Sequence, residues 1–249
     1  DNYLVKQVID EAKRLGISAT VDKDDYNYSN SKAILVTSIQ TIVNGHSYFG
    51  MREAGNYPIG SIIIDDVHAC MDKIIDQFMI KIDAETDAYK ELIALFSSSL
   101  KDYNPKNYID VVEMKDCRNN MLVPYWEWQR QQDNIYRILT KYNNSDNTSI
   151  YFGLPLIERC LETCDCIITA SAIEISPKGI DLDKISSLEE ASRRIYMSAT
   201  LADDSVFVSA LGLDTEDMKN IITPENANDM GDRLIIFPKY VNSDISEIE

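Results

Sequence analysis

The chain of 249 residues is 45% hydrophobic and 26% charged, which is an ordinary composition for a folded globular protein. Its 41 Asp and Glu outnumber 24 Lys and Arg and give a formal net charge of −17, which excludes a protein whose whole surface binds nucleic acid. No apolar run approaches the roughly 20 residues that span a bilayer, and no signal peptide opens the sequence. We therefore expect no membrane partner, and a cytoplasmic, intracellular protein whose five cysteines are free thiols.

The first predicted element is an amphipathic helix at the amino terminus. Apolar side chains recur with helical spacing from Leu4 to Leu15, and Gly16 is a natural stop. A soluble domain seldom begins with such a helix, so we expect the chain to start inside a larger domain. The polar stretch 22–32 separates this helix from the next apolar run.

Three short apolar runs, at 33–36, 61–64 and 194–197, predict buried strands of a parallel sheet. Polar residues follow each run: Thr37-Ser38, Asp65-Asp66 and Ser198-Ala199-Thr200. Polar residues end many strands, but three such ends together, one with paired carboxylates, favour a site. Ligands of open parallel α/β sheets bind at the carboxyl ends of the strands.

The long segment 71–165 between the second and third strands predicts a mostly α-helical insertion. Apolar stripes at helical spacing run from Met71 to Ile82, from Tyr89 to Phe96 and from Ile135 to Tyr142. This segment is far longer than a crossover between two parallel strands requires.

The paired carboxylates of Asp65 and Asp66 are the sharpest functional signal. An apolar strand that runs into adjacent acids is how a Walker B element is built. The first acid binds Mg²⁺, directly or through water, and the second orients the attacking water in phosphoryl transfer. His68 follows the strand closely enough to sense the terminal phosphate. We therefore predict Asp65, Asp66 and His68 as catalytic residues, with Asp65 as the metal ligand.

Two short motifs carry a resemblance to a known family. Asp65-Asp66-Val67-His68 resembles the Asp-Glu-x-His of motif II in the DExH-type helicases of superfamily 2. Ser198-Ala199-Thr200 resembles the Ser-Ala-Thr of motif III, again directly after an apolar strand and in the family's order. Two weaker matches, Asn2–Gln7 and Thr37–Thr41, stand where motifs Ia and Ib lie. A strand followed by a capped helix explains this weaker pair equally well.

The resemblance implies an incomplete RecA-like α/β domain of the P-loop NTPase type, bound to ATP and Mg²⁺ in the parent protein. Its parts would be residues 1–70, a helical insertion at 71–165, a second α/β part at 166–215 and a lead-in to a further domain at 216–249. Three residues would couple nucleotide state to the bound strand, and four would contact nucleic acid. The coupling residues are Ser198, Ala199 and Thr200, and the contacting residues are Thr37, Ser38, Gln40 and Thr41.

The position of the insertion resembles the layout of XPD-type DNA helicases. That layout favours single-stranded DNA over RNA as the partner. The iron–sulfur module of that group precedes motif II, whereas this chain has no cysteine before Cys70, so we expect no iron–sulfur cluster.

The chain departs from the helicase pattern in two respects. No Gly-x-x-x-x-Gly-Lys-Ser/Thr occurs, so we expect the chain alone to be inactive and the phosphate loop and second RecA-like domain to lie outside it. Asp66 stands where the family has Glu, and its carboxylate is about 1.5 Å shorter in reach. Displacements near 1 Å cost catalysis roughly 100-fold, so the parent enzyme is expected to hydrolyse slowly or to use a second water.

For the function of the chain and for two groups of its residues, the sequence leaves two interpretations open. The chain is either part of a helicase or a degenerate scaffold whose helical insertion binds a protein partner. Tyr125–Trp128 either stacks on bases or belongs to a core, and the core is the commoner fate. Cys160, Cys164 and Cys166 are better read as buried thiols than as zinc ligands, because a structural zinc needs four closed ligands.

Overall fold

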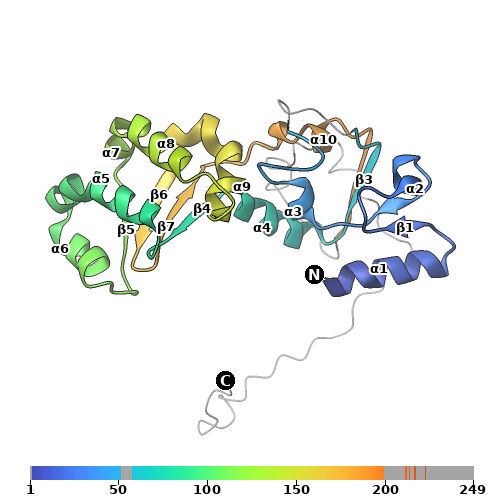
Figure 1. The fold of residues 1–249 in the computed structure, drawn as a ribbon, viewed down its shortest axis with the longest axis horizontal. Helices are drawn as coiled ribbons and strands as arrows, with labels where there is room; N and C mark the ends of the chain where they lie inside the picture. The colour runs from blue at the N-terminus through green and yellow to red at the C-terminus, as the bar shows by residue number, and fades with distance from the viewer. Residues whose placement is uncertain are drawn as a thin grey trace, which may run out of the picture. The chain divides into compact units, whose positions relative to one another are not determined.

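The computed structural model describes residues 2–51 and 58–198 and the single positions Leu211, Leu213, Glu216 and Ile222. It is a mixed α/β structure in which helices accompany two small parallel sheets and one antiparallel sheet (Figure 1). The chain divides into compact units at residues 1–212 and 213–249, and every element named below belongs to the first unit. Among the residues described, no helix is both long enough and apolar enough to cross a membrane.

The amino-terminal helix α1 (Asn2–Arg14) is confirmed, and Gly16 ends it in the left-handed conformation at φ 73°. The Ile17 N–H donates to the Ala12 carbonyl at 2.8 Å, which satisfies a carbonyl of the last turn. Helix α1 is followed by β1 (Ala19–Thr20) and the short helix α2 (Tyr26–Ser29).

The predicted strand at 33–36 forms only the two residues of β2 (Ile34–Leu35), which pairs in parallel with β1. The expectation that this strand is buried is wrong, because Ile34 keeps 53% of its surface exposed. Within the described residues β2 also belongs to a different sheet from the other two predicted strands. The segment that follows it continues into the short helix α3 (Ile39–Ile42).

The other two predicted strands, β3 (Ser61–Ile64) and β8 (Arg193–Tyr196), are neighbours in one parallel sheet. The pairing continues past the strands: the Met197 N–H donates to the Ile64 carbonyl at 2.8 Å, and the Val67 N–H donates to the Met197 carbonyl at 3.0 Å. Burial alternates along β3, so Ile62 and Ile64 are buried while Ile63 is 60% exposed. The expectation of buried strands is therefore wrong for one face of β3 and for the run 194–197, where Ile195 and Met197 are 40% and 42% exposed.

Helices make up most of segment 71–165, as predicted, but the segment also contributes β4 and β5 to a four-stranded antiparallel sheet that the sequence did not predict. Its strand order is β4-β7-β6-β5. Strands β6 and β7 lie beyond the boundary we placed at residue 165, yet they pair with β5 and β4 of the insertion. The strands are β4 (Ile80–Asp83), β5 (Asn120–Leu122), β6 (Asp165–Thr169) and β7 (Ala172–Ser176).

Helices accompany this sheet, beginning with α4 (Val67–Gln77), which leads from β3 into the insertion. Helix α4 contacts both α3 and α9. The helical segments of the insertion are α5 (Asp87–Tyr103), α6 (Pro105–Tyr108), the π-helical η1 (Ile109–Glu113), α7 (Tyr125–Arg130), α8 (Gln132–Lys141), α9 (Thr148–Ile157) and the 3₁₀ segment η2 (Glu158–Thr163). Two short segments, η3 (Leu182–Lys184) and α10 (Ser186–Glu189), lead back to β8.

The hydrophobic core lies mainly in the inserted segment. The largest fully buried side chains of the described residues all fall between Ile74 and Ile157, and they include Phe96 and Trp128. The indole N–H of Trp128 donates to the Leu161 carbonyl at 2.7 Å, which satisfies its one polar atom.

Candidate functional site

The predicted acids Asp65 and Asp66 are both exposed directly after β3. Asp66 has a left-handed backbone (φ 47°, ψ 61°), a conformation that Asp adopts more readily than most residues. Its N–H donates to Asp65 Oδ1 at 3.0 Å, and its carbonyl accepts from the Cys70 N–H in the first turn of α4. The chain therefore turns sharply from strand to helix at the two carboxylates.

His68 and Ser198 meet across the carboxyl ends of β3 and β8. His68 Nδ1 lies 2.8 Å from Ser198 Oγ, although the two residues are 130 positions apart in the sequence. Both side chains are half-buried. The parallel pairing of β3 and β8 thus joins the motif II-like and motif III-like segments at one edge. Ala199 and Thr200, the other two predicted coupling residues, lie outside the described residues.

Cys70 also lies at this edge, although we did not predict it as a site residue. Its thiol donates to the Asp65 carbonyl at 3.4 Å. Burial raises the pKa of the Cys70 thiol, and the nearby charges of Asp66 and Asp65 raise it further. Asp66 and Cys70 are four residues apart, and on a predicted helix this spacing indicates that the thiol lies beside the acids.

The carboxylates fit one way of holding Mg²⁺ and not another. Among residues 2–51 and 58–198, no cluster of three or more His, Cys, Asp or Glu is close enough to form a cage from protein ligands. Mg²⁺ commonly uses one or two carboxylates and completes its coordination with water and substrate phosphates. The exposed pair Asp65 and Asp66 fits this second arrangement.

The predicted nucleic-acid contacts Thr37, Ser38, Gln40 and Thr41 lie at and just before α3, and all four are half-buried. Ser38 is the N-cap residue of α3, but its hydroxyl lies 3.2 Å from the Thr41 hydroxyl and does not cap a backbone N–H. Because α3 contacts α4, this segment is held beside the helix that begins at Asp66.

The backbone carbonyls of α3 are bonded to the loop that follows it. Asn44 Nδ2 donates to the Gln40 carbonyl at 2.6 Å, and Ser47 Oγ donates to the Thr41 carbonyl at 3.2 Å. These two carbonyls therefore accept bonds from within the protein, and the ligand contacts predicted for this segment depend on its side chains.

The same loop is docked on α9 of the insertion through Gly45 and His46. The Gly45 N–H donates to the Phe152 carbonyl at 2.8 Å, and a Cβ at Gly45 would lie 2.5 Å from that oxygen. The His46 ring stacks on Tyr151 with ring centroids 3.8 Å apart and planes 10° apart. A close backbone approach and an aromatic stack thus connect the α3 segment to the insertion.

The Tyr125–Trp128 segment divides between surface and core. Trp128 is 2% exposed, whereas Tyr125 and Trp126 are 68% and 51% exposed. Glu127 is buried and forms an ion pair with Arg130. The core interpretation therefore holds for Trp128 and does not hold for Tyr125 and Trp126.

The grouped cysteines are free thiols, with Cys164 and Cys166 buried and Cys160 half-buried. Burial raises the pKa of Cys164 to about 12, with smaller contributions from the neighbouring Cys160 and Asp165. The Cys164 thiol donates to the Cys160 carbonyl at 3.4 Å. These environments disfavour the thiolate that a metal site requires.

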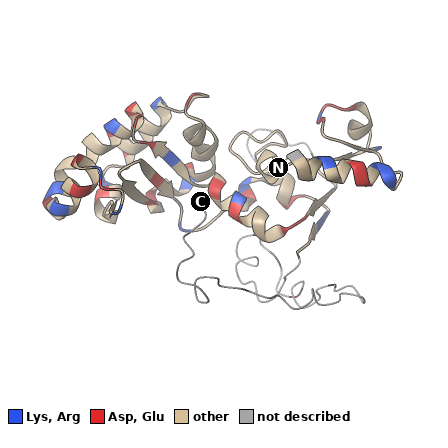
Figure 2. Cartoon of the chain, turned by 90° about the horizontal axis from the view of Figure 1, so that it is seen from below, with Lys and Arg blue, Asp and Glu red and all other residues tan. Residues whose placement is uncertain are grey.

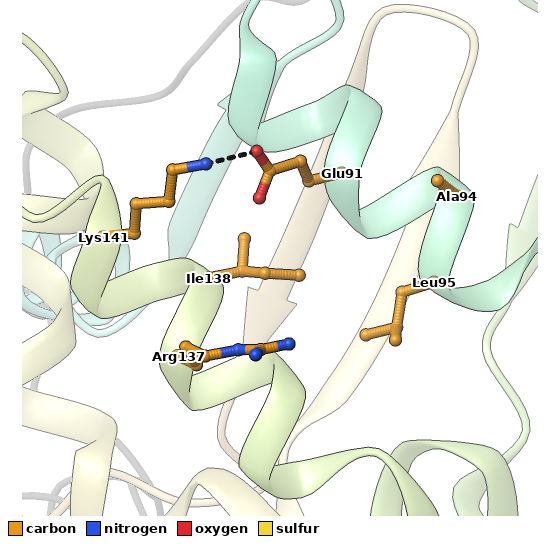
Figure 3. Close-up of a pocket in the computed structure, with 6 residues that line it drawn as sticks. All are labelled: Glu91, Ala94, Leu95, Arg137, Ile138 and Lys141. Carbon is orange, nitrogen blue, oxygen red and sulfur yellow. Dashed lines mark hydrogen bonds and ion pairs between the residues drawn. The ribbon is translucent and has the colours of Figure 1, made fainter.

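A shallow groove lies between α5 and α8, apart from the predicted site residues (Figure 3). Its lining includes Leu95 and Ile138, and an ion pair between Glu91 and Lys141, 2.5 Å long, stands at one side. Figure 2 shows Lys and Arg interleaved with Asp and Glu along the helices, with no single basic stripe among the described residues.

No protein-family model matches the sequence, and comparisons with curated proteins and with solved structures found no match either.

Proposed function

We propose that the chain is part of an ATP-dependent helicase or translocase that moves on single-stranded nucleic acid, with DNA favoured over RNA. One observation carries the proposal: the parallel pairing of β3 and β8 brings Asp65, Asp66, His68 and Ser198 to one sheet edge. Substrates of open parallel α/β sheets bind at that edge. The RecA-like fold and the assignment to superfamily 2 belong to this proposal.

In this proposal Asp65 holds Mg²⁺ through water, and Asp66 orients the water that attacks the terminal phosphate. The metal neutralises charge on the phosphate oxygens when bound. His68 senses the occupied site and passes the change to Ser198 through their 2.8 Å contact. Ala199 and Thr200 would extend this coupling, and Thr37, Ser38, Gln40 and Thr41 would contact the strand.

The packing around α4 supports a route from the nucleotide to the strand. Helix α4 begins at the acids and contacts α3, which carries the proposed nucleic-acid contacts. The loop after α3 is fixed to α9 through Gly45 and His46. A shift at the start of α4 would therefore reach both the α3 segment and the insertion.

A second candidate function, a catalytically degenerate scaffold, is favoured by the geometry at Asp66. The side chain is one methylene shorter than Glu, and the Asp66 N–H already occupies an oxygen of Asp65. Asp adopts the left-handed backbone at this position more readily than Glu does. The turn therefore favours Asp here, in place of the Glu of the helicase motif. In that case the insertion, through its exposed surface, would bind a protein partner.

The proposed cellular location is the cytoplasm. All five cysteines are free thiols, as expected of a protein in a reducing compartment.

ATP hydrolysis by the complete gene product that carries this chain tests the proposal. The complete product is required because no Gly-x-x-x-x-Gly-Lys-Ser/Thr occurs in these 249 residues. Asp65→Ala should lower Mg²⁺-dependent hydrolysis at least about 100-fold, because it removes the proposed metal ligand. Asp72→Ala, at an exposed acid on helix α4, is the matched control and should leave the rate unchanged. Hydrolysis at the background rate in the wild type and in both variants would instead favour the scaffold.

A further inference from the structure

Three aromatic side chains of the insertion form an exposed cluster that the proposed ATPase chemistry does not use. Tyr103, at the end of α5, is 59% exposed, and Tyr125 and Trp126, at the start of α7, are 68% and 51% exposed. We call these three residues the aromatic cluster. Trp126 contacts both tyrosines edge-to-face, with ring centroids 5.5 Å from Tyr103 and 5.3 Å from Tyr125.

The cluster is distinct from the core on the other side of the same helix. Trp128, two positions further along α7, is buried beside Phe96 and bonded to the Leu161 carbonyl. Helix α7 thus turns one tryptophan inward and leaves the other on the surface. Edge-to-face contact fixes the three rings relative to one another, while each residue keeps more than half of its surface accessible.

Residues 101–141, which include the aromatic cluster, differ from the rest of the chain in their balance of charge. Residues 101–141 contain 7 Lys and Arg and 6 Asp and Glu, whereas the remaining residues contain 17 and 35. The aromatic cluster therefore lies in a stretch where cations slightly outnumber anions, in a chain that is otherwise strongly acidic. Lys106 and Lys115 are exposed in this stretch, and Arg118 is exposed and forms an ion pair with Asp116.

We propose that the aromatic cluster binds unpaired bases of a single nucleic-acid strand by stacking. Aromatic rings stack on the faces of all bases, and cations such as those of residues 101–141 attract the phosphates. Such a surface therefore binds a strand whatever its base sequence. The inference rests on the proposed function for its choice of nucleic acid as the partner. It adds a second contact region, in the insertion, to the contacts proposed at Thr37–Thr41.

The first test measures binding of a fluorescein-labelled oligothymidylate to the 249-residue chain by anisotropy, without nucleotide. Trp126→Ala and Tyr103→Ala should each raise the Kd about 5- to 150-fold, because stacking is lost. Trp126→Phe keeps an aromatic face and should stay within about 3-fold of the wild type. Tyr26→Ala removes an aromatic side chain that is 75% exposed on α2, and is the matched control with no expected effect.

Tryptophan fluorescence gives a second readout from the same titration. The chain has two tryptophans, and Trp128 is buried. The strand should therefore quench Trp126 alone, and Trp126→Phe should abolish the quenching while binding persists. Binding that Trp126→Ala and Tyr103→Ala leave unchanged would overturn the stacking surface and favour a protein partner for it. An absence of binding by the wild type would also overturn it, whereas the Asp65 hydrolysis assay tests the proposed function independently of this surface.

Discussion

The parallel pair β3–β8 and the four-stranded antiparallel sheet, which α4 connects along the chain, differ in how deeply their side chains are buried. The parallel pair β3–β8 carries the proposed site, yet Ile63, Ile195 and Met197 on or beside it are each at least 40% exposed. The antiparallel sheet of the insertion is packed against helices, and Ile80, Ile168, Ile173 and Ile175 on its strands are fully buried. The polar residues proposed to do chemistry thus lie on the weakly buried pair, and most of the buried apolar surface lies in the insertion.

The inserted segment is therefore a structural support as well as an addition to a parallel sheet. Its core fixes α9, to which the loop after α3 is docked, and α4, which starts at the acids. We infer that the insertion carries most of the folding free energy of the described residues.

Removing a core side chain should cost far more in the insertion than on the parallel pair. Leu92→Ala, at a side chain with 0% exposure on α5, should lower the free energy of unfolding by about 2–5 kcal/mol. Ile63→Ala, on β3, should cost less than about 1 kcal/mol because that side chain is already in water. Urea denaturation of both variants checks the difference, and equal losses would contradict the comparison.

The docking of the α3 loop on α9 should be sensitive to a single methyl group. Gly45→Ala places a Cβ 2.5 Å from the Phe152 carbonyl, which is backbone and cannot rotate away. We expect a loss of about 1–3 kcal/mol in the free energy of unfolding. Gly179→Ala is the matched control, since no atom lies within 4 Å of the point where its Cβ would stand. Similar thermal stability of the two variants would show that the loop is not held there.

The buried thiol of Cys164 should make the insertion less stable at alkaline pH. Its pKa is raised from 9.0 to about 12 by burial, so the folded state keeps a proton that the unfolded state releases. The contribution of the protonated Cys164 thiol to the free energy of unfolding is complete below pH 9 and is lost as the pH rises from 9 towards 12. Between pH 8 and 10 the wild type should lose about 1.4 kcal/mol that Cys164→Ala does not lose. Parallel pH profiles of the two proteins in urea titrations would argue against this burial.

The contact between His68 and Ser198 should give the smallest effect. A double-mutant cycle with His68→Ala, Ser198→Ala and the double variant should yield a coupling energy of about 0.5–1.5 kcal/mol in unfolding experiments. The 2.8 Å separation of Nδ1 and Oγ is the reason. Additive losses would mean that the two strand ends are not coupled through these side chains.

Some of this architecture is readable from local patterns. The helical spacing before Gly16 predicts α1, and the apolar runs that precede Asp65 and Ser198 predict two strands. The meeting of His68 with Ser198 follows from the resemblance in motif order and not from any local pattern, because 130 residues separate them.

Other parts depend on pairings that the sequence does not display. Strands β6 and β7 are short apolar runs separated only by Ala170-Ser171, and their place beside β4 is fixed by contacts about ninety residues distant in sequence, as in the pair Ile82–Ile173. The exposure of Ile34 and Ile63 was unpredictable for a similar reason, since an apolar run does not reveal whether one or both faces are covered.

We propose that the β3–β8 edge binds and hydrolyses ATP in response to a nucleic-acid strand. The most direct measurement compares ATP hydrolysis by the complete gene product with and without single-stranded DNA, in the wild type and in Asp65→Ala. We expect DNA to stimulate hydrolysis by the wild type, and Asp65→Ala to show no hydrolysis above background in either condition. A folded wild type that hydrolyses no faster than Asp65→Ala, with or without DNA, would contradict it.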